Sequence, residues 1–393
     1  MSRSPGPALL SRSRPTGLRN TGPVTAGTQE HPAVTGPAAA ELDRLRTAVS
    51  GALAQFLDSQ RETLAAMDPS LTPVVDEVCA IAEGGKRLRP AFAYWGWRGA
   101  RDPAAAEDEA AVLTAVAALE FVHASALVHD DVMDGAQTRR GRPATHIGFA
   151  ARHSGHDLDG DGQLFGVGAA ILVGDLALVW SDELLRRSGI SAAALTRARA
   201  VWDTMRTEVT AGQYLDLLRA AGGLPGADGA MKVARYKSAG YTVQRPLHLG
   251  AAIAGAAPEV TEAYTAIGLP LGEAFQLRDD VLGVFGDPAV TGKSADDDLR
   301  EGKQTLLISL AEESADAAGR RLLDDLLGNA DAGPEEFDAL RALLESTGAR
   351  ARVEERITER TALARAAIAA APLADDARAA LDALAVAATS RTA

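Results

Sequence analysis

Apolar residues recur at helical spacing along much of the chain, and two of these stretches run directly into clusters of aspartates. The second stretch is followed by a break at Gly286-Asp287-Pro288. Recurrence at three and four residues predicts amphipathic helices, and glycine with proline predicts a helix end. Each aspartate cluster is therefore expected at the end of a core helix. The apolar positions are Ala111, Val112, Val116, Ala117, Leu119, Val122, Ala126 and Leu127 in the first stretch and Leu269, Leu271, Ala274, Phe275 and Leu277 in the second.

The two acidic clusters are Asp130-Asp131-Val132-Met133-Asp134 and Asp279-Asp280-Val281-Leu282-Gly283. Residues three or four apart on a helix are neighbours, so Asp134 can point the same way as Asp130 or Asp131. Such carboxylates repel one another unless a cation lies between them, and Mg²⁺ combines them with substrate phosphates. Two facing helices of a bundle could hold this site. The alternative is a solvated acidic surface, which the apolar stretch before each cluster disfavours.

Arginine supplies most of the positive charge. The chain has only five lysines, Lys86, Lys232, Lys237, Lys293 and Lys303. Lysine offers a phosphate a compact charge, while arginine offers a fork of donors. Both occur in Gly84-Gly85-Lys86-Arg87-Leu88-Arg89-Pro90, and Arg139-Arg140-Gly141 follows the first acidic cluster. Either segment alone could be a solvated basic turn. Together with the acids they indicate a site for a diphosphate.

The motifs between about Val78 and Leu307 resemble those of the all-trans polyprenyl diphosphate synthases, and most of all actinobacterial geranylgeranyl diphosphate synthases. The resemblance implies an all-α isoprenoid synthase fold, an orthogonal or antiparallel helical bundle around a central cavity. Its remaining motifs are Gly212-Gln213-Tyr214-Leu215-Asp216, Lys237-Ser238, Phe275-Gln276-Leu277-Arg278-Asp279-Asp280, Thr291-Gly292-Lys293 and Asp298-Leu299-Arg300-Glu301-Gly302-Lys303.

The implied activity is condensation of isopentenyl diphosphate with an allylic diphosphate, which gives a linear all-trans product and releases diphosphate. The resemblance also implies a homodimer. It assigns isopentenyl diphosphate to Lys86, Arg89, His123 and Arg140. It assigns the allylic substrate to Arg139, Lys237, Ser238, Gln276 and Lys293, and it adds Gln213 and Lys303 as substrate-binding residues without assigning them to one substrate. The expected catalytic residues are Lys237 and the acids, with three Mg²⁺ ions bound by Asp130, Asp134 and Asp279 and supported by Asp131 and Asp280.

Product length should depend on the helix before Asp130. Residues four and five positions earlier are Ala126 and Ser125, which are small and leave the pocket open. One turn further down, Phe121 and Val122 are candidates for its floor. Geranylgeranyl diphosphate is the expected product, with a longer chain as the alternative. Phe121 could instead only pack in the core.

One departure from the family pattern concerns the second cluster. It ends in Gly283, where many members have a third aspartate. Metal binding on this side would therefore depend on Asp279 and Asp280.

Composition indicates a helical enzyme of the cytoplasm. The 393 residues are 47% hydrophobic and 4% aromatic, enough for a large helical core. A net charge of −13 argues against a nucleic-acid partner. The lone Cys79 excludes an intramolecular disulfide and fits a reducing compartment. The longest apolar stretch, 164–180, contains Asp175 and is shorter than the roughly 18 apolar residues of a membrane span, so integral membrane association is not expected.

The domain organisation follows from local composition. Residues 1–38 are rich in Pro, Gly, Ser and Arg and predict a disordered tail, while 39–393 are expected to form one domain. A Gly/Asp-rich surface loop is expected near 151–163. Asp157, Asp159 and Asp161 match the start of a calcium loop, but its last position is Gly168 and calcium is not expected. Helices with a break near Gly333-Pro334 should continue to about Ala388.

Two rival functions share part of this chemistry. A class I terpene cyclase also ionises a diphosphate with Mg²⁺ on an aspartate-rich helix, but it does not need a second diphosphate pocket around Lys86, Arg89 and His123. A non-catalytic subunit of a prenyl synthase heteromer would be expected to lack one aspartate cluster.

Overall fold

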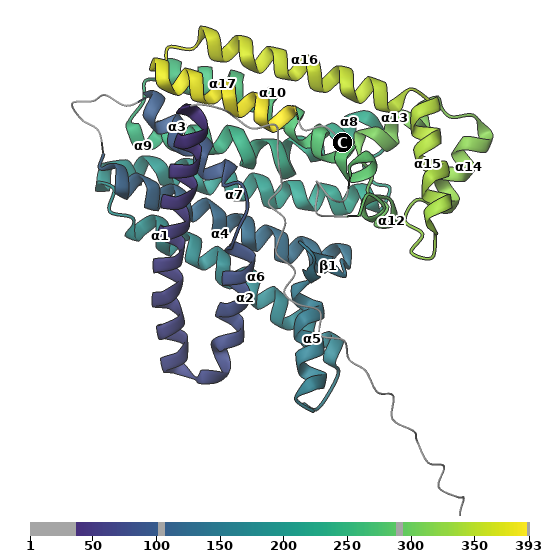
Figure 1. The fold of residues 1–393 in the computed structure, drawn as a ribbon, viewed down its shortest axis with the longest axis horizontal. Coiled ribbons are helices and arrows are strands. Elements are labelled where there is room, and N and C mark those ends of the chain that lie inside the picture. The colour runs from purple at the N-terminus through teal and green to yellow at the C-terminus, as the bar shows by residue number, and fades with distance from the viewer. Residues whose placement is uncertain (1–36, 101–106, 288–293, 391–393) are drawn as a thin grey trace, which may run out of the picture. The chain divides into compact units, whose positions relative to one another are not determined.

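The computed structural model describes residues 37–100, 107–287 and 294–390. Lys293 and residues 1–36 of the expected tail therefore lie outside the described residues. The described part is helical apart from one short hairpin (Figure 1), and the all-α prediction is confirmed. A helix begins at Pro37, two residues before the predicted start of the domain at residue 39.

The elements before the second acidic cluster alternate long helices with short turns. In chain order they are α1 (Pro37–Met67), the 3₁₀ turn η1 (Pro69–Leu71), α2 (Thr72–Ala82), α3 (Leu88–Ala100), α4 (Glu109–Asp134), β1 (Thr138–Arg139), β2 (Arg142–Pro143), α5 (Thr145–Gly155), α6 (Gly162–Arg187), α7 (Ala192–Ala220), α8 (Gly226–Val233), the π-helical η2 (Ala234–Gln244), α9 (Arg245–Ala254) and α10 (Pro258–Phe285).

Of the described helices after the second cluster, α16 is the longest. These helices are α12 (Asp297–Arg300), α13 (Leu306–Ser314), α14 (Ala317–Leu326), α15 (Pro334–Ser346), α16 (Ala349–Ala370) and α17 (Asp375–Thr389). The predicted break near Gly333-Pro334 is confirmed, because α15 begins at Pro334, where the fixed φ of proline suits the first turn. The last helix ends at Thr389, one residue beyond the predicted end.

Both acidic clusters end long helices, as the apolar pattern predicted. Helix α4 begins after Asp108, whose carboxylate accepts a bond from the backbone N–H of Ala111. It ends at Asp134, because Gly135 adopts a left-handed φ of 67° that stops the helix. Helix α10 ends at Phe285, immediately before the predicted break.

The two helices pack against different neighbours and share only α9 among the stronger contacts. Helix α4 packs against α6, whereas α10 packs against α16 and η2, and η2 also packs against α7. A large hydrophobic core joins α1, α3, α4, α6, α7 and α9 to the first half of α10. A second core surrounds the acidic end of α10 and includes Leu277, Val281 and residues of α13, α15 and α16. Figure 1 shows α10 beneath α16 and α17.

Two helices have the length and mean hydropathy of a membrane span, which the sequence analysis did not expect. They are α4 and α6. In α4, 78% of the apolar window is buried inside the protein, as expected for a core helix. In α6 only 39% is buried. The sequence prediction required a continuous run of apolar residues. It missed α6 because Asp175 interrupts that run, although one face of the helix remains apolar.

The Gly/Asp-rich loop is shorter than predicted. Helix α5 continues to Gly155 and α6 begins at Gly162, so the connection comprises 156–161 rather than 151–163. His156 extends the first helix by bonding the Arg152 carbonyl through Nδ1 at 2.9 Å. The Asp161 carboxylate accepts the Gln163 N–H at 2.8 Å and so caps α6. Glycine and aspartate mark the helix ends here rather than an extended loop.

Candidate active site

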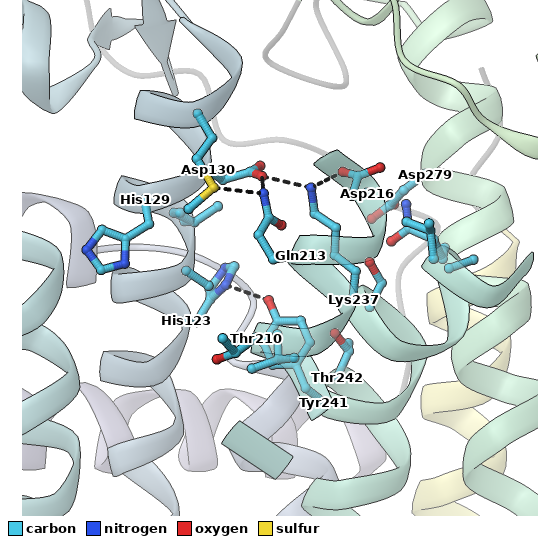
Figure 2. Close-up of a pocket in the computed structure, with 18 of the residues that line it drawn as sticks. His123, His129, Asp130, Thr210, Gln213, Asp216, Lys237, Tyr241, Thr242 and Asp279 are labelled. Carbon is cyan, nitrogen blue, oxygen red and sulfur yellow. Dashed lines mark hydrogen bonds and ion pairs between the residues drawn. The ribbon is translucent and has the colours of Figure 1, made fainter. Parts of the chain in front are cut away.

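A cavity of about 430 Å³ lies between the ends of α4 and α10. Helix α7, the π-helical η2 and residues 303–306 complete its walls. Figure 2 shows polar side chains from α4, α7, η2 and α10 pointing into it. Of the residues singled out from the sequence, those lining it are Arg89, Val122, His123, Ser125, Ala126, Asp130, Gln213, Lys237, Ser238, Gln276, Asp279, Asp280 and Lys303.

Asp130 is the acid of the first cluster that faces this cavity. Its Oδ1 accepts bonds from Lys237 Nζ at 2.7 Å and from Gln213 Nε2 at 2.8 Å (Figure 2). Burial would raise the pKa of Asp130, but the ammonium of Lys237 outweighs it and holds the pKa below its usual value. Lys237 also donates to Asp216 Oδ2 at 2.6 Å. One lysine thus lies between two carboxylates from different helices.

The other acids of the first cluster lie differently. Asp131 is buried and pairs with Arg139, whose Nε donates to Oδ1 at 2.8 Å. Both line a second, small hollow that also includes Arg140, so Asp131 faces away from the main cavity. Burial and the neighbouring Asp130 raise the pKa of Asp134 to about 6. Asp134 therefore lies close enough to Asp130 for their charges to interact.

The acids of the second cluster both line the main cavity. Asp280 is buried and accepts a bond from Gln276 Nε2, one turn earlier, at 2.8 Å. Burial, with smaller contributions from the charges of Asp298 and Asp279, raises the pKa of Asp280 to about 7. Gln276 is thus occupied by this acid as well as facing the cavity.

The donor set fits Mg²⁺ only if a ligand supplies further oxygens. Among the described residues, no group of three or more acidic, histidine or cysteine side chains is close enough to hold a metal alone. Mg²⁺ usually binds one or two carboxylates together with water and substrate phosphates. Asp130 from α4 and the pair Asp279 and Asp280 from α10 line the cavity with Lys237 and Lys303, while Asp134 lies outside the lining but near enough to Asp130 for their charges to interact. This arrangement suits a metal–diphosphate complex.

A group of cations gathers at the start of α3. Arg89 Nη2 donates to Tyr241 Oη at 2.5 Å and to Thr242 Oγ1 at 3.1 Å, and its guanidinium lies 4.3 Å from the tyrosine ring centre. His123 Nδ1 lies 3.0 Å from the same Tyr241 Oη (Figure 2). Burial lowers the pKa of His123 well below its usual value, and four nearby arginines, Arg89, Arg140, Arg139 and Arg87, lower it further. Such a concentration of positive charge suits an anionic ligand.

The glycine-rich segment before α3 is braced from two sides. Arg140 Nη1 donates to the carbonyls of Ile81 at 3.1 Å and Glu83 at 3.2 Å. Arg140 is presented by the turn between β1 and β2, where it and Gly141 have φ values of 52° and 73°. Two left-handed residues give the type I′ turn that joins short antiparallel strands. Lys86 is exposed at the tip of the braced segment.

Sequence reasoning missed three residues of this site. Arg87 was only part of a basic motif, yet its Nη1 lies 2.6 Å from Glu120 Oε2 in a buried ion pair. Asp216 belonged to a quoted motif but had no assigned role. Tyr241 had no sequence signal except its position four residues after Lys237, and it lies on the π-helical η2. Such helices often occur at functional sites.

Part of the cavity wall is formed by α4. Val122, Ser125 and Ala126 line it, as the chain-length hypothesis requires. Phe121 does not line it. Its ring lies 5.4 Å from that of Phe56 and 6.3 Å from that of Trp180 between centres, so Phe121 packs in the core, the alternative raised from the sequence.

Comparison with known proteins identifies the family. Residues 71–344 match the model of the polyprenyl synthetase family. The chain belongs to this family. A solved geranylgeranyl pyrophosphate synthase from Corynebacterium glutamicum, complexed with isoprenyl diphosphate and magnesium, aligns with a TM-score of 0.86 and 41% identity over 89% of this chain and 99% of that one.

Characterised polyprenyl synthetases of similar sequence differ in product. The chain is 35% identical to a geranylfarnesyl diphosphate synthase from Aeropyrum pernix over 63% of this chain and 72% of the relative. It is 34% identical to a (2E,6E)-farnesyl diphosphate synthase from Mycobacterium tuberculosis over 72% of this chain and 76% of the relative. Family membership therefore establishes a prenyltransferase that makes linear polyprenyl diphosphates, and it leaves their length open.

Proposed function

We propose that this polyprenyl synthetase is a Mg²⁺-dependent enzyme that elongates an allylic diphosphate with isopentenyl diphosphate and forms geranylgeranyl diphosphate. The observation that carries the proposal is the arrangement of the cavity. Acids from α4 and α10 line it together with Lys237 and Lys303, Arg89 and His123 line it within a group of arginines, and the small residues Ser125 and Ala126 of α4 form part of its wall.

The acids are assigned to the metal. Asp130, Asp134 and Asp279 would hold three Mg²⁺ ions against the allylic diphosphate, with Asp131 and Asp280 orienting the site. Bound Mg²⁺ supplies charge neutralisation of the leaving diphosphate. Gln213 and Lys237 keep Asp130 in place, and the pairing with Lys237 keeps it ionised. The magnesium in the C. glutamicum relative supports this assignment.

The cations are divided between the two substrates. Lys237, Ser238, Gln213, Gln276 and Lys303 line the cavity beside the acids, where they would contact the allylic diphosphate together with Arg139 and Lys293. Lys86, Arg89, His123 and Arg140 would bind isopentenyl diphosphate. The pKa of His123 is strongly lowered, so we expect its ring to be neutral and to act as a hydrogen-bond partner rather than a charge.

The chemistry needs no protein nucleophile. The allylic C–O bond breaks as the diphosphate leaves, and the double bond of isopentenyl diphosphate attacks the allylic cation to form the new C–C bond. A proton then leaves for the departing diphosphate. Preorganised positive charge at the leaving group stabilises this ionisation. The apolar wall of α4 keeps water from the cation.

The product length is proposed from α4. Ser125 and Ala126 leave the cavity open at the level where an aromatic residue would block it, and Val122 lies one turn deeper. This supports twenty carbons rather than fifteen. A longer product is the alternative, because one relative is a geranylfarnesyl diphosphate synthase, which makes a longer chain.

The exposed face of α6 is proposed as the homodimer interface. Large apolar side chains recur at seven-residue spacing along it, from Leu164 to Ile171 and from Phe165 through Leu172 to Val179. Leu172 and Val179 are 65% and 61% exposed. Seven residues are two helical turns, so these positions share one face. An apolar face of this kind is typical of a contact with another protein copy.

We place the dimer in the cytoplasm as one domain from residue 39 onward. Its lone cysteine, Cys79, supports a reducing compartment.

The test is to incubate the purified protein with Mg²⁺, labelled isopentenyl diphosphate and each of the dimethylallyl, geranyl and farnesyl diphosphates, and then to size the dephosphorylated products. We expect linear products that end at twenty carbons. Asp130→Ala should abolish turnover with an unchanged circular dichroism spectrum. Cyclic products would indicate a terpene cyclase, and no elongation from any primer would indicate a non-catalytic subunit.

A further inference from the structure

The second acidic cluster contains two carboxylates in sequence, and Gly283 stands one turn after Asp279. A residue four positions later on a helix lies on the same face. The side of α10 that carries the cavity-lining Asp279 therefore has a position without a side chain one turn later, where a carboxylate could have joined the acids.

A carboxylate from another element fills this position. Asp298, on α12, lies against Gly283. A Cβ atom added at Gly283 would lie 2.7 Å from Cγ of Asp298 and closer still to its Oδ2. Real Cβ atoms do not approach other atoms this closely. Any side chain at position 283 would therefore displace the Asp298 carboxylate.

The remaining contacts of Asp298 fix its orientation. Its Oδ1 accepts a bond from Lys303 Nζ at 2.9 Å, so Oδ1 faces Lys303 while Oδ2 faces α10. The backbone N–H of Lys303 donates to the Asp298 carbonyl at 3.0 Å, which fixes the distance between the two residues along the chain. The Asp298 side chain is only 12% exposed. It is a held carboxylate rather than a mobile surface group.

The surroundings connect Asp298 to the cavity. Lys303 lines the cavity together with Asp279 and Asp280. The charge of Asp298 acts on the buried Asp280, and Lys303 lies close enough to Asp130 for their charges to interact. The Asp298–Lys303 pair is thus near enough for its charges to interact with acids of both α10 and α4.

We propose that Asp298 supplies the third carboxylate of the second acidic cluster, and that Gly283 is required because only glycine leaves space for it. The carboxylate of Asp298, together with those of Asp279 and Asp280, helps to bind the divalent cation that accompanies diphosphate. This inference rests on the proposed function, which supplies the metal and the diphosphate.

The experiment measures binding rather than turnover. Thermal unfolding of the full chain is followed at a fixed concentration of inorganic pyrophosphate while Mg²⁺ is increased. The Mg²⁺ concentration for half of the stabilisation gives an apparent affinity. We expect Asp298→Asn to raise this concentration about tenfold, as for groups that support a metal site. Gly283→Ala should weaken the response similarly, because the new methyl group displaces the Asp298 carboxylate.

Two further variants make the test specific. In the double variant Gly283→Asp with Asp298→Gly, the carboxylate returns to α10 and we expect most of the affinity to be restored. Asp297→Asn is the matched control: Asp297 lies on the same helix and pairs with Arg300 at 3.2 Å, and its loss should leave the Mg²⁺ response unchanged.

The outcomes test the proposed function and the role of Asp298 separately. If the unchanged protein shows no stabilisation by Mg²⁺ with pyrophosphate, the proposed function fails. If that stabilisation occurs and Asp298→Asn matches it at every Mg²⁺ concentration, only the role of Asp298 fails. A lower melting temperature of Asp298→Asn without Mg²⁺ would report its bond to Lys303, so each variant is compared with its own metal-free baseline. Should Gly283→Ala fail to fold, Asp298→Asn alone decides.

Discussion

The ammonium of Lys237 lies 2.7 Å from Oδ1 of Asp130, and the two residues come from helices that the sequence separates by more than a hundred positions. The same ammonium lies 2.6 Å from Asp216 Oδ2. Because the two carboxylates raise the pKa of Lys237 despite its burial, the lysine stays charged. It is therefore a fixed positive charge at the place where the leaving diphosphate is proposed to develop negative charge.

Replacing Lys237 should impair the chemical step more than the fold. In Lys237→Met, we expect kcat to fall about a hundredfold, because one preorganised charge at the leaving group is lost. Steady-state kinetics with saturating Mg²⁺ measure this. Lys232→Met, which removes an exposed lysine on the preceding helix, is the control and should retain normal kcat. Equal kcat in both variants would contradict the assigned role.

The buried Arg87–Glu120 pair should contribute to stability and to the binding of isopentenyl diphosphate. The two side chains are 6% and 7% exposed, and Arg87 Nη1 lies 2.6 Å from Glu120 Oε2. Glu120→Gln leaves the arginine charge buried without an opposite charge, so we expect the free energy of unfolding to fall by about 3 kcal/mol. Urea unfolding checks this.

The same change should act on one substrate more than on the other. Arg87 lies between Lys86 and Arg89, so a loosened segment should raise KM for isopentenyl diphosphate several-fold and leave KM for the allylic primer nearly unchanged. A matched rise in both KM values would mean that the pair only supports the fold.

The length of the product should respond to Ser125. Ser125 lines the cavity on α4, so the ring of Ser125→Phe would occupy the space of the growing chain. We expect products to end at fifteen carbons or fewer, as measured by chromatography of the dephosphorylated alcohols. Ala110→Phe, at an exposed position of the same helix, should leave the product unchanged. Twenty-carbon products from Ser125→Phe would refute the role of α4.

Acid should destabilise the fold in part through His248. Its Nε2 lies 3.0 Å from Thr265 Oγ1 and its Nδ1 lies 3.1 Å from Arg245 Nη1, while Arg245 is paired with Glu208. Burial, and then the charge of Arg245, lowers the pKa of His248 from 6.5 to about 4. The unfolded chain therefore binds the proton first, and stability is lost as the pH falls from about 6.5 towards 4.

Comparison with His248→Gln isolates this contribution. Between pH 7 and pH 5 we expect the unchanged protein to lose about 2 kcal/mol more unfolding free energy than His248→Gln does, from about 1.4 kcal/mol per pKa unit. Urea unfolding at both pH values measures the difference. Identical losses would show that His248 does not titrate in this range.

The exposed face of α6 should control assembly. A charge at Leu172 would lie in the proposed interface, so we expect Leu172→Glu to convert dimers into monomers in sedimentation measurements. Leu363→Glu places the same charge on an apolar residue of α16 that is 48% exposed, and it should leave the mass unchanged. Monomers formed by the unchanged protein at micromolar concentration would contradict the proposed dimer.

The sequence by itself determined the features that depend on near neighbours along the chain. The period of apolar residues specified α4 and α10, and the break after Phe285 specified where α10 ends. The acidic and basic motifs were sufficient to indicate the family, because their chemistry is contained in short segments. Helix formation depends on contacts within a few residues, so these features could be read locally.

Only the tertiary structure decided which of these groups meet. It turned Asp131 towards Arg139 and away from the main cavity, buried Phe121 against Phe56, and brought Asp298 against Gly283. Each of these outcomes depends on how helices pack and rotate against one another. Such packing joins residues that are far apart in sequence, and no local pattern encodes it.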